Sequence, residues 1–338
     1  MLGYDDANPD AARDRALKGD ADRRLIESLL YLCEVAEKGS GRRFTRARDG
    51  LEKARSAVGT DGGDLRGIVY VLHSRLLSAL RAGDETIARR TLDALATTDL
   101  FKSGLDVWGV GGGRWSDFER QAFRDTMSSE HEREYKLPFD ARPPDQADLG
   151  RVAGAVSHTL AQIEALDAET YHEFRRLVSD VVIIKSEHIN AGTSFRAFGV
   201  LLLRELGPER VWTTYLENLV HEAAHLHLFL IWSVDPVIEN EAEQSFSSPL
   251  RPGGRPLSAI YHAMFVLART IRAVNIFRRS EAHRADVERM STSYNYAKNP
   301  AGFEQKFRET YETVKVNARL TPLGSRLLES CREMALGS

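Results

Sequence analysis

Three histidines and a glutamate stand in the apolar segment LENLVHEAAHLHLFLIW, Leu216 to Trp232. On a helix, residues four apart lie on one face, so His221 and His225 direct their imidazoles to one point while Glu222 projects beside them. Burying these groups among leucines is costly unless they have partners, and a divalent metal ion is such a partner. The segment therefore predicts a metal site. His227 points to another side of the helix, and we expect it to be packed in the core.

Two histidines leave a metal site incomplete, so a third protein ligand is expected. Three protein ligands keep positions open for water or substrate, as a hydrolytic zinc and an oxygen-activating iron both require. One set of candidates is the acidic segment ENEAEQ, with Glu239, Glu241 and Glu243. The other candidate is His262, in the apolar segment LSAIYHAMFVLARTIR, although periodicity alone favours a core histidine there.

The chain from Ser179 onward resembles a known family. VHEAAHLHLFLIWSVDP followed by SPLRPGGRPLSAIYHAMFVLAR is similar to the HExxH-motif domain found beside ribosomal-peptide modification genes in bacteria. That family has a second block after its HExxH helix, and this chain matches it at Ser248, Pro249, Arg251, Arg255, Pro256, Leu257 and His262. The chain departs from the block at Leu250, where the family usually has tryptophan, and at Ala259, where it often has glycine.

Some members of that family are peptide β-hydroxylases that use iron and 2-oxoglutarate. The resemblance therefore implies Fe(II) held by His221, His225 and His262, with a carboxylate of the ENEAEQ segment as the alternative third ligand. It implies a ribosomally made peptide as substrate and hydroxylation of a side-chain β-carbon. In this scheme Glu222 orients water or a ligand histidine from outside the metal's own ligand set.

An oxygenase of this kind must also hold the distal carboxylate of 2-oxoglutarate. Arg255 and Arg251 are the candidates, because a guanidinium can bind a carboxylate through two parallel hydrogen bonds. Without the resemblance, a surface ion pair would be the favoured interpretation of both arginines.

Two other functions remain open. In a zinc-dependent peptidase, Glu222 would be the general base that deprotonates a metal-bound water. In a non-catalytic peptide-binding protein, the metal would be structural and closed by four protein ligands.

Composition points to an ordinary globular protein. The chain has 338 residues, 42% of them hydrophobic, and 46 Lys and Arg against 49 Asp and Glu leave a formal net charge of −3. This balance does not favour a nucleic acid or an anionic membrane as a partner. Cys33 and Cys331 lie far apart and predict no disulfide framework. The acidic, polar start lacks a signal pattern, and we expect no membrane-spanning run, so a cytoplasmic location is expected.

The elements that must position these residues are mainly helices. Helical periodicity runs from Ala21 to Ala96, with Asp84 as a helix cap, and a Pro-containing linker at Lys136 to Asp148 suggests a domain boundary. We expect a helical N-terminal region, residues 1–140, that can recognise a peptide or leader, and an HExxH metal-dependent catalytic domain, residues 148–338. The basic segment GRRFTRAR is expected to be a solvated helix face, and the Gly-rich VWGVGGGRW a turn.

A small sheet is expected within the second region. The run DVVIIK, Asp180 to Lys185, has the length and β-branching of a strand, and FRAFGVLLLREL can pair back on it. We expect an α+β fold that is mainly α with a small antiparallel β-sheet, and a zincin-like HExxH helix in the metal site. A peptide substrate could add as a strand at an edge around Val181 to Lys185.

Overall fold

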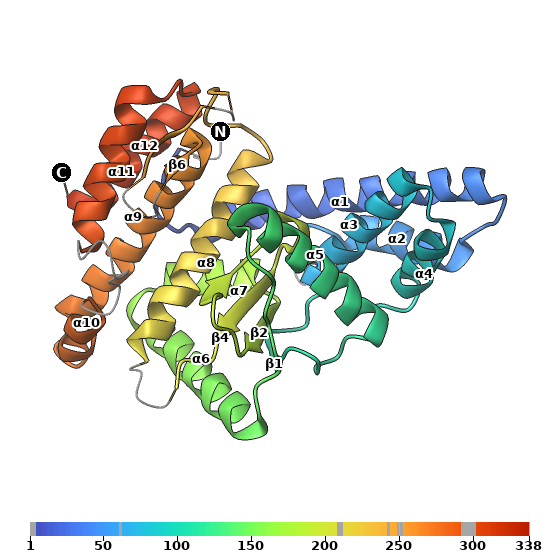
Figure 1. The fold of residues 1–338 in the computed structure, drawn as a ribbon, viewed down its shortest axis with the longest axis horizontal. Helices are drawn as coiled ribbons and strands as arrows, with labels where there is room; N and C mark the ends of the chain where they lie inside the picture. Colours follow the sequence, from blue (N-terminus) through green and yellow to red (C-terminus); the bar gives the residue numbers. More distant parts are fainter. Residues whose placement is uncertain are drawn as a thin grey trace. The chain divides into compact units, whose positions relative to one another are not determined.

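The structure is a computed structural model that describes residues 5–60, 63–207, 212–241, 244–248, 250, 253–291 and 302–337. It is mainly helical with a small mixed sheet (Figure 1), which confirms the predominance of helices. The chain divides into two compact units: the first comprises Met1–Asp14, Gly154–Phe174 and Leu206–Ser338, and the second comprises Arg15–Ala153 and Arg175–Glu205. The predicted linker lies inside the second unit.

The second unit contains the N-terminal helices. They are α1 (Ala11–Ser40, mostly in this unit), α2 (Thr45–Ala57), α3 (Gly67–Ala82), α4 (Glu85–Leu95) and α5 (Asp117–Tyr135), with the start of α6 (Gln146–Leu166) and the end of α7 (Ala168–Leu177). Gly83 ends α3 in the left-handed region at φ 68°, and the side chain of Asp84 accepts a hydrogen bond from the backbone N of Ile87. The predicted cap is therefore confirmed.

The four-stranded sheet also belongs to the second unit. Its order is β1-β2-β4-β3, formed by β1 (Asp106–Gly109), β2 (Asp180–Ile184), β4 (Val200–Arg204) and β3 (Ala191–Gly192). β2 pairs with both β1 and β4 in parallel, and only β3 is antiparallel to its neighbour. The expected antiparallel sheet is therefore wrong. The connection from β2 to β4 carries β3 and the 3-10 helix η1 (Phe195–Ala197), and it is long enough for a parallel return.

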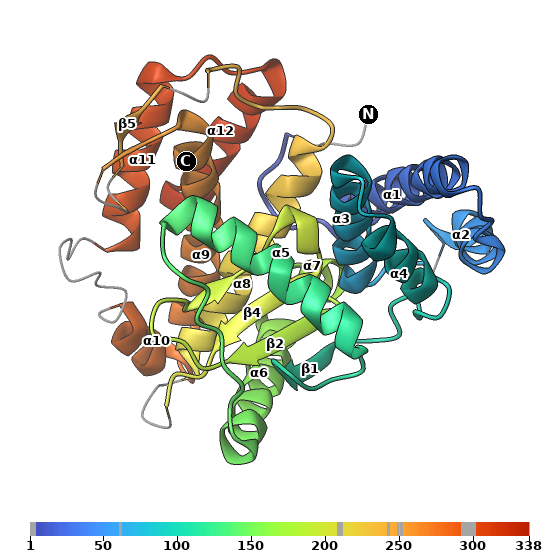
Figure 2. The same cartoon turned by 45° about the vertical axis from the view of Figure 1, so that its right-hand side comes forward.

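The prediction that a peptide adds at a sheet edge around Val181 to Lys185 is also wrong. β2 lies between β1 and β4 and is buried along its whole length, so both of its hydrogen-bonding sides are used (Figure 2). A continuous apolar run is typical of a strand inside a parallel sheet. β1 and β3 are the edges of this sheet.

The Gly-rich segment forms a turn, as expected, but its first three residues belong to β1, which was not expected. Gly113 has a φ of 81°, and a Cβ built on it would lie 2.6 Å from the ring of Trp108. Glycine is therefore required there by both backbone conformation and space. The turn leads into α5, where Ser116 and Glu119 form a reciprocal capping box.

The first unit holds the metal-motif helix. It contains α8 (Thr213–Trp232), α9 (Leu257–Arg279), α10 (Arg284–Ser291), α11 (Phe303–Asn317) and α12 (Pro322–Leu336), and the short strands β5 (Phe246–Ser247) and β6 (Gly254–Arg255). α9 packs against α8, α10, α11 and α12, and Figure 1 shows α11 and α12 beside it. Thr321 caps α12 through the backbone N of Gly324.

α9 passes a length and composition test for a membrane-spanning helix, contrary to our expectation that no segment would do so. In the structure 72% of the apolar 18-residue stretch of this helix is buried inside the protein. A central core helix of a folded unit has the same composition, and the packing of four helices around α9 fits that role.

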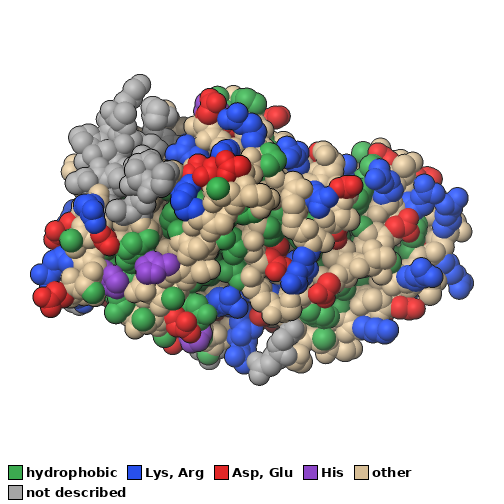
Figure 3. Space-filling view, turned by 90° about the horizontal axis from the view of Figure 1, so that it is seen from below, with side chains coloured by type: hydrophobic (Ala, Val, Ile, Leu, Met, Phe, Trp, Pro, Cys, Tyr) green, Lys and Arg blue, Asp and Glu red, His purple; other side chains and the backbone are tan. Residues whose placement is uncertain are grey.

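Charged side chains are mixed over the surface that Figure 3 shows, with Lys and Arg interspersed among Asp and Glu. In the basic segment, Arg42, Arg43 and Arg46 are exposed, and Arg48 forms ion pairs at 3.4 Å with Glu34 and Glu37. The segment is therefore solvated, as predicted, but only its part from Thr45 onward is helical, and Arg42 and Arg43 precede α2.

Candidate metal centre

α8 brings the motif residues together. Its sequence buries leucines and alanines on most sides, and Glu222 is 4% exposed, while His221 and His225 are half-buried. The four-residue spacing of the two histidines places them one above the other on this helix. Because both imidazoles are partly exposed, a ligand can reach them.

The two imidazoles have the separation that a shared ion needs. Nε2 of His221 lies 3.1 Å from Nε2 of His225, and the ligand atoms of these residues and of Glu222 all lie within 4.8 Å of one another. An ion bound at about 2.0–2.1 Å to each nitrogen would hold them roughly 2.9–3.4 Å apart, for bond angles between octahedral and tetrahedral. The donor set of imidazole and carboxylate fits zinc or ferrous iron.

His262 reaches the pair from α9. Its Nε2 lies 2.6 Å from Nδ1 of His225, the ring nitrogen that does not face His221. Burial and the nearby His221 lower the pKa of His262 to about 3, so its imidazole is neutral near pH 7. His262 therefore contacts the back of a candidate ligand, and it does not belong to the three-residue group of His221, Glu222 and His225. Its assignment as the third ligand stays a prediction.

The contact with His262 can also fix the proton of His225. If Nδ1 of His225 donates to Nε2 of His262, the lone pair on Nε2 of His225 is left free for a metal. Ligand histidines commonly have such a partner on the second ring nitrogen.

The remaining sequence candidates lie elsewhere or outside the described residues. Glu239 and Glu241 are exposed, and neither belongs to the group at His221. Glu239 is held through its backbone N, which donates to the carbonyl of Arg319 at 2.8 Å. Glu243 and Arg251 lie outside the described residues. Arg255 is half-buried in β6, two residues before α9 begins.

Sequence reasoning missed Glu217, which precedes His221 by one helical turn. Glu217 is 9% exposed, and burial together with the nearby Glu222 raises its pKa to about 8, while Lys306 acts in the opposite direction. It therefore keeps its proton at neutral pH. The spacing of four from Glu217 to His221 and again to His225 was a signal that could have identified it.

Aromatic rings surround His262. The ring centroids of Trp232 and Phe229, both on α8, lie 4.9 and 5.1 Å from that of His262, in edge-on arrangements. These rings limit the rotamers of His262 and reduce the water around it.

His227 is fully buried, as predicted, but its neighbours were not predicted. Its Nδ1 lies 2.9 Å from Oδ1 of Asp14 and 3.4 Å from Oε2 of Glu173. Burial lowers the pKa of His227 well below its usual range, so the ring is neutral.

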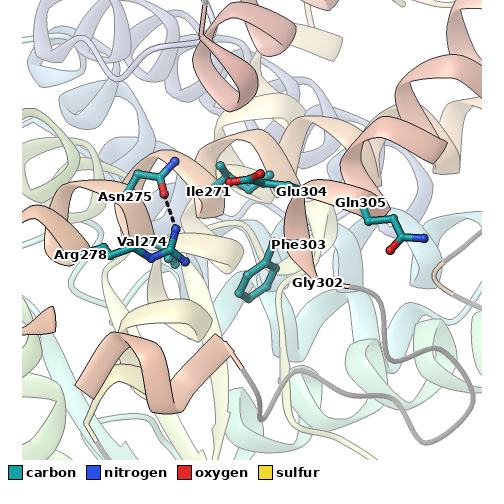
Figure 4. A pocket seen from close by; sticks show the side chains of 8 residues that line it. All are labelled: Ile271, Val274, Asn275, Arg278, Gly302, Phe303, Glu304 and Gln305. Atoms are coloured by element: carbon teal, nitrogen blue, oxygen red, sulfur yellow. Dashed lines mark hydrogen bonds between the residues drawn. The ribbon is translucent and has the colours of Figure 1, made fainter. Parts of the chain in front are cut away.

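A separate small pocket of about 200 Å³ lies between α9 and the start of α11, and Figure 4 shows Asn275 accepting a hydrogen bond from Arg278 in its wall. Its lining includes none of the candidate metal residues. It is therefore not the centre that the motif predicts.

Comparison with protein-family models and with curated proteins finds no match to this chain.

Proposed function

We propose that the protein is an Fe(II)- and 2-oxoglutarate-dependent oxygenase that hydroxylates a side-chain β-carbon of a ribosomally made peptide. The observation that carries the metal part of the proposal is the 3.1 Å separation between Nε2 of His221 and Nε2 of His225, beside the buried Glu222. The choice of iron and 2-oxoglutarate rests on the sequence resemblance.

The residues of the chain have separate roles in this proposal. His221 and His225 bind the metal through Nε2. His262 is the proposed third ligand, a role that requires a change of rotamer at His225 or His262, because Nε2 of His262 faces Nδ1 of His225 in this structure. When bound, ferrous iron with 2-oxoglutarate supplies the oxygen chemistry that hydroxylates a carbon–hydrogen bond. Phe229 and Trp232 keep water away from His262, and the carboxyl of Glu222 accepts hydrogen bonds from water or substrate groups near the metal.

Arg255 is the proposed partner of the distal carboxylate of 2-oxoglutarate. It lies directly before α9, the helix that carries His262 two turns further on. Its guanidinium can make two parallel hydrogen bonds to a carboxylate, which a lysine cannot reproduce. Arg251 has the same proposed role.

A zinc-dependent peptidase is the second candidate, and the position of Glu222 favours it. A ligand oxygen of Glu222 lies within 4.8 Å of the ligand nitrogens of both histidines, where a general base would meet a metal-bound water. In the proposed oxygenase this carboxyl transfers no proton. Replacing Glu222 should therefore lower a peptidase activity strongly and an oxygenase activity only weakly.

The deciding experiment is an assay of both reactions with the same protein and peptide pool. Anaerobically purified protein receives ferrous iron, 2-oxoglutarate, oxygen and candidate peptides, and succinate and peptide masses are measured. We expect a gain of one oxygen atom that depends on 2-oxoglutarate, is lost in Arg255→Ala and is weak in Arg255→Lys. Arg326→Ala, which changes an exposed arginine paired with Asp5, is the control. Peptide cleavage with zinc alone, unaffected by 2-oxoglutarate, would establish the peptidase instead.

A further inference from the structure

Four buried charged residues surround His227 on the side of α8 away from the candidate metal. Asp14, Glu173, Arg269 and Arg13 are each at most 3% exposed, and His227 is 0% exposed. Nη1 of Arg269 lies 2.9 Å from Oε2 of Glu173, and Nε of Arg13 lies 3.9 Å from Oδ1 of Asp14. We call these five residues the His227 cluster.

The His227 cluster has ligand spacing for a second metal, but its charges argue against one. Asp14, Glu173 and His227 offer ligand atoms within 4.8 Å of one another. Two arginines already balance the two carboxylates when the imidazole is neutral. A divalent ion would leave about two uncompensated positive charges in a site without solvent, and such charges are expensive to bury.

The His227 cluster instead connects α8 to α9 through a closed set of contacts. The ring of His227 is stacked on Phe265 of α9, with centroids 5.9 Å apart and an interplanar angle of 2°. Arg269, one turn further along α9, has its guanidinium carbon 5.3 Å from the Phe265 centroid and pairs with Glu173. Glu173 returns to His227 at 3.4 Å, which closes the set.

These contacts lie on the same two helices as the candidate metal site. His225 and His227 are two residues apart on α8, and His262 and Phe265 are three residues apart on α9. A helix turns by about 100° per residue, so any rotation of α8 that shifts His227 also shifts His225 against His262. Packed interiors transmit such shifts because they have few voids.

We infer that Asp14, Glu173 and Arg269 are positioning residues for the metal centre, which they serve by fixing the rotation of α8 against α9 through His227. This inference rests on the proposed metal site for its functional meaning.

Ion pairs with Arg269 and Arg13 hold the carboxylates of Glu173 and Asp14, and these carboxylates and Phe265 pack against the neutral ring of His227. Within the described residues, neither oxygen of Asp14 and neither nitrogen of His227 has a partner in good hydrogen-bond geometry. Glu173→Gln and Asp14→Asn keep the side-chain shape and remove the charge, so they are sharp tests.

The matched control is Asp167→Asn. Asp167 is also a buried carboxylate that pairs with an arginine of α9, Arg272, through two hydrogen bonds, and it does not touch His227. Its loss removes a comparable ion pair on α9 and leaves the His227 cluster intact.

Two readouts separate this inference from the metal proposal. The first is the imidazole ¹H–¹⁵N spectrum of the metal-free protein, which reports the contact of His225 with His262 directly. The second is the dissociation constant of Co(II), with its visible spectrum. We expect Glu173→Gln and Asp14→Asn to shift the signals of His225 and His262 and to weaken Co(II) about 10-fold or more. Asp167→Asn should leave both readouts as in wild type, even where it lowers the melting temperature.

Each outcome decides one of the two ideas. Unchanged imidazole signals and unchanged Co(II) binding in both cluster variants overturn the inference, as does an equal effect of Asp167→Asn. Shifted imidazole signals in a protein that binds no Co(II) support the role of the cluster in fixing α8 against α9 and reject the metal proposal. If Glu173→Gln does not fold, the double variant with Glu173→Gln and Arg269→Gln is used instead. It removes both charges of this ion pair, and the same two readouts are measured on it.

Discussion

Nδ1 of His225 on α8 lies 2.6 Å from Nε2 of His262 on α9, while Nε2 of the same His225 ring lies 3.1 Å from Nε2 of His221. Both nitrogens of one imidazole are therefore engaged, one toward the candidate metal position and one toward the next helix. A displacement of His262 on α9 would therefore move His225 and change the geometry of the candidate metal site.

Removing either histidine of the motif should remove the metal. We expect His221→Ala and His225→Ala to lose most bound metal and to remain folded and helical, because each supplies one of two ligand nitrogens 3.1 Å apart. Metal content after dialysis and circular dichroism measure this. His172→Ala, at an exposed position on α7, is the control. Full metal occupancy in both motif variants would contradict the site.

Substitutions of His262 distinguish a metal ligand from a residue that only orients His225. If His262 is the third ligand, His262→Ala and His262→Gln should both weaken metal binding by at least about 10-fold. Glutamine can still hydrogen-bond Nδ1 of His225, so near-normal affinity in His262→Gln alone would mean that His262 only orients His225. Glu239→Gln and Glu241→Gln, both at exposed positions, should bind metal as wild type does.

Glu222 distinguishes the two proposed reactions. Loss of a general base lowers a rate by roughly 10²–10⁴-fold. For an oxygenase we expect Glu222→Gln to retain metal and to lower 2-oxoglutarate-dependent hydroxylation by less than about 10-fold, since glutamine still orients water. Turnover by wild type and variant is compared at saturating metal. A loss near 10³-fold, accompanied by peptide cleavage in the wild type, would assign the carboxyl to hydrolysis.

Glu217 should make stability depend on pH. Burial raises its pKa from 4.5 to about 8, with Glu222 as a further cause, so the folded protein retains a proton that the unfolded chain releases. Stability should therefore fall as the pH rises from about 4.5 to 8, because the unfolded state binds fewer protons over that range.

Glu217→Gln tests this dependence. The unfolding free energy of the wild type should fall between pH 5 and pH 8, and glutamine has no proton to lose. The difference in unfolding free energy between variant and wild type should therefore shift in favour of the variant by on the order of a few kcal/mol over this range. Urea unfolding at the two pH values measures it. An unchanged difference between variant and wild type would show that Glu217 ionises normally.

The sequence by itself determined the local features. Periodicity identified the helices between residues 21 and 96, Asp84 was identified as a cap from its position before a helical segment, and the spacing in HEAAH placed His221 and His225 on one face of α8. These features depend on neighbours within a few residues along the chain, so a local pattern suffices to predict them.

The pairing and partners of these elements were decided only by the tertiary structure. Strand patterns for β2 and β4 were visible, but their direction depends on how the connection returns, so the sheet is largely parallel and Val181 to Ile184 lie in its interior. The sequence marked His262 without showing which nitrogen of His225 it would meet. Asp14, Glu173 and Arg269 lie far from one another in the sequence and on three different helices. Only the packing of these helices with α8 brings their charges together around His227.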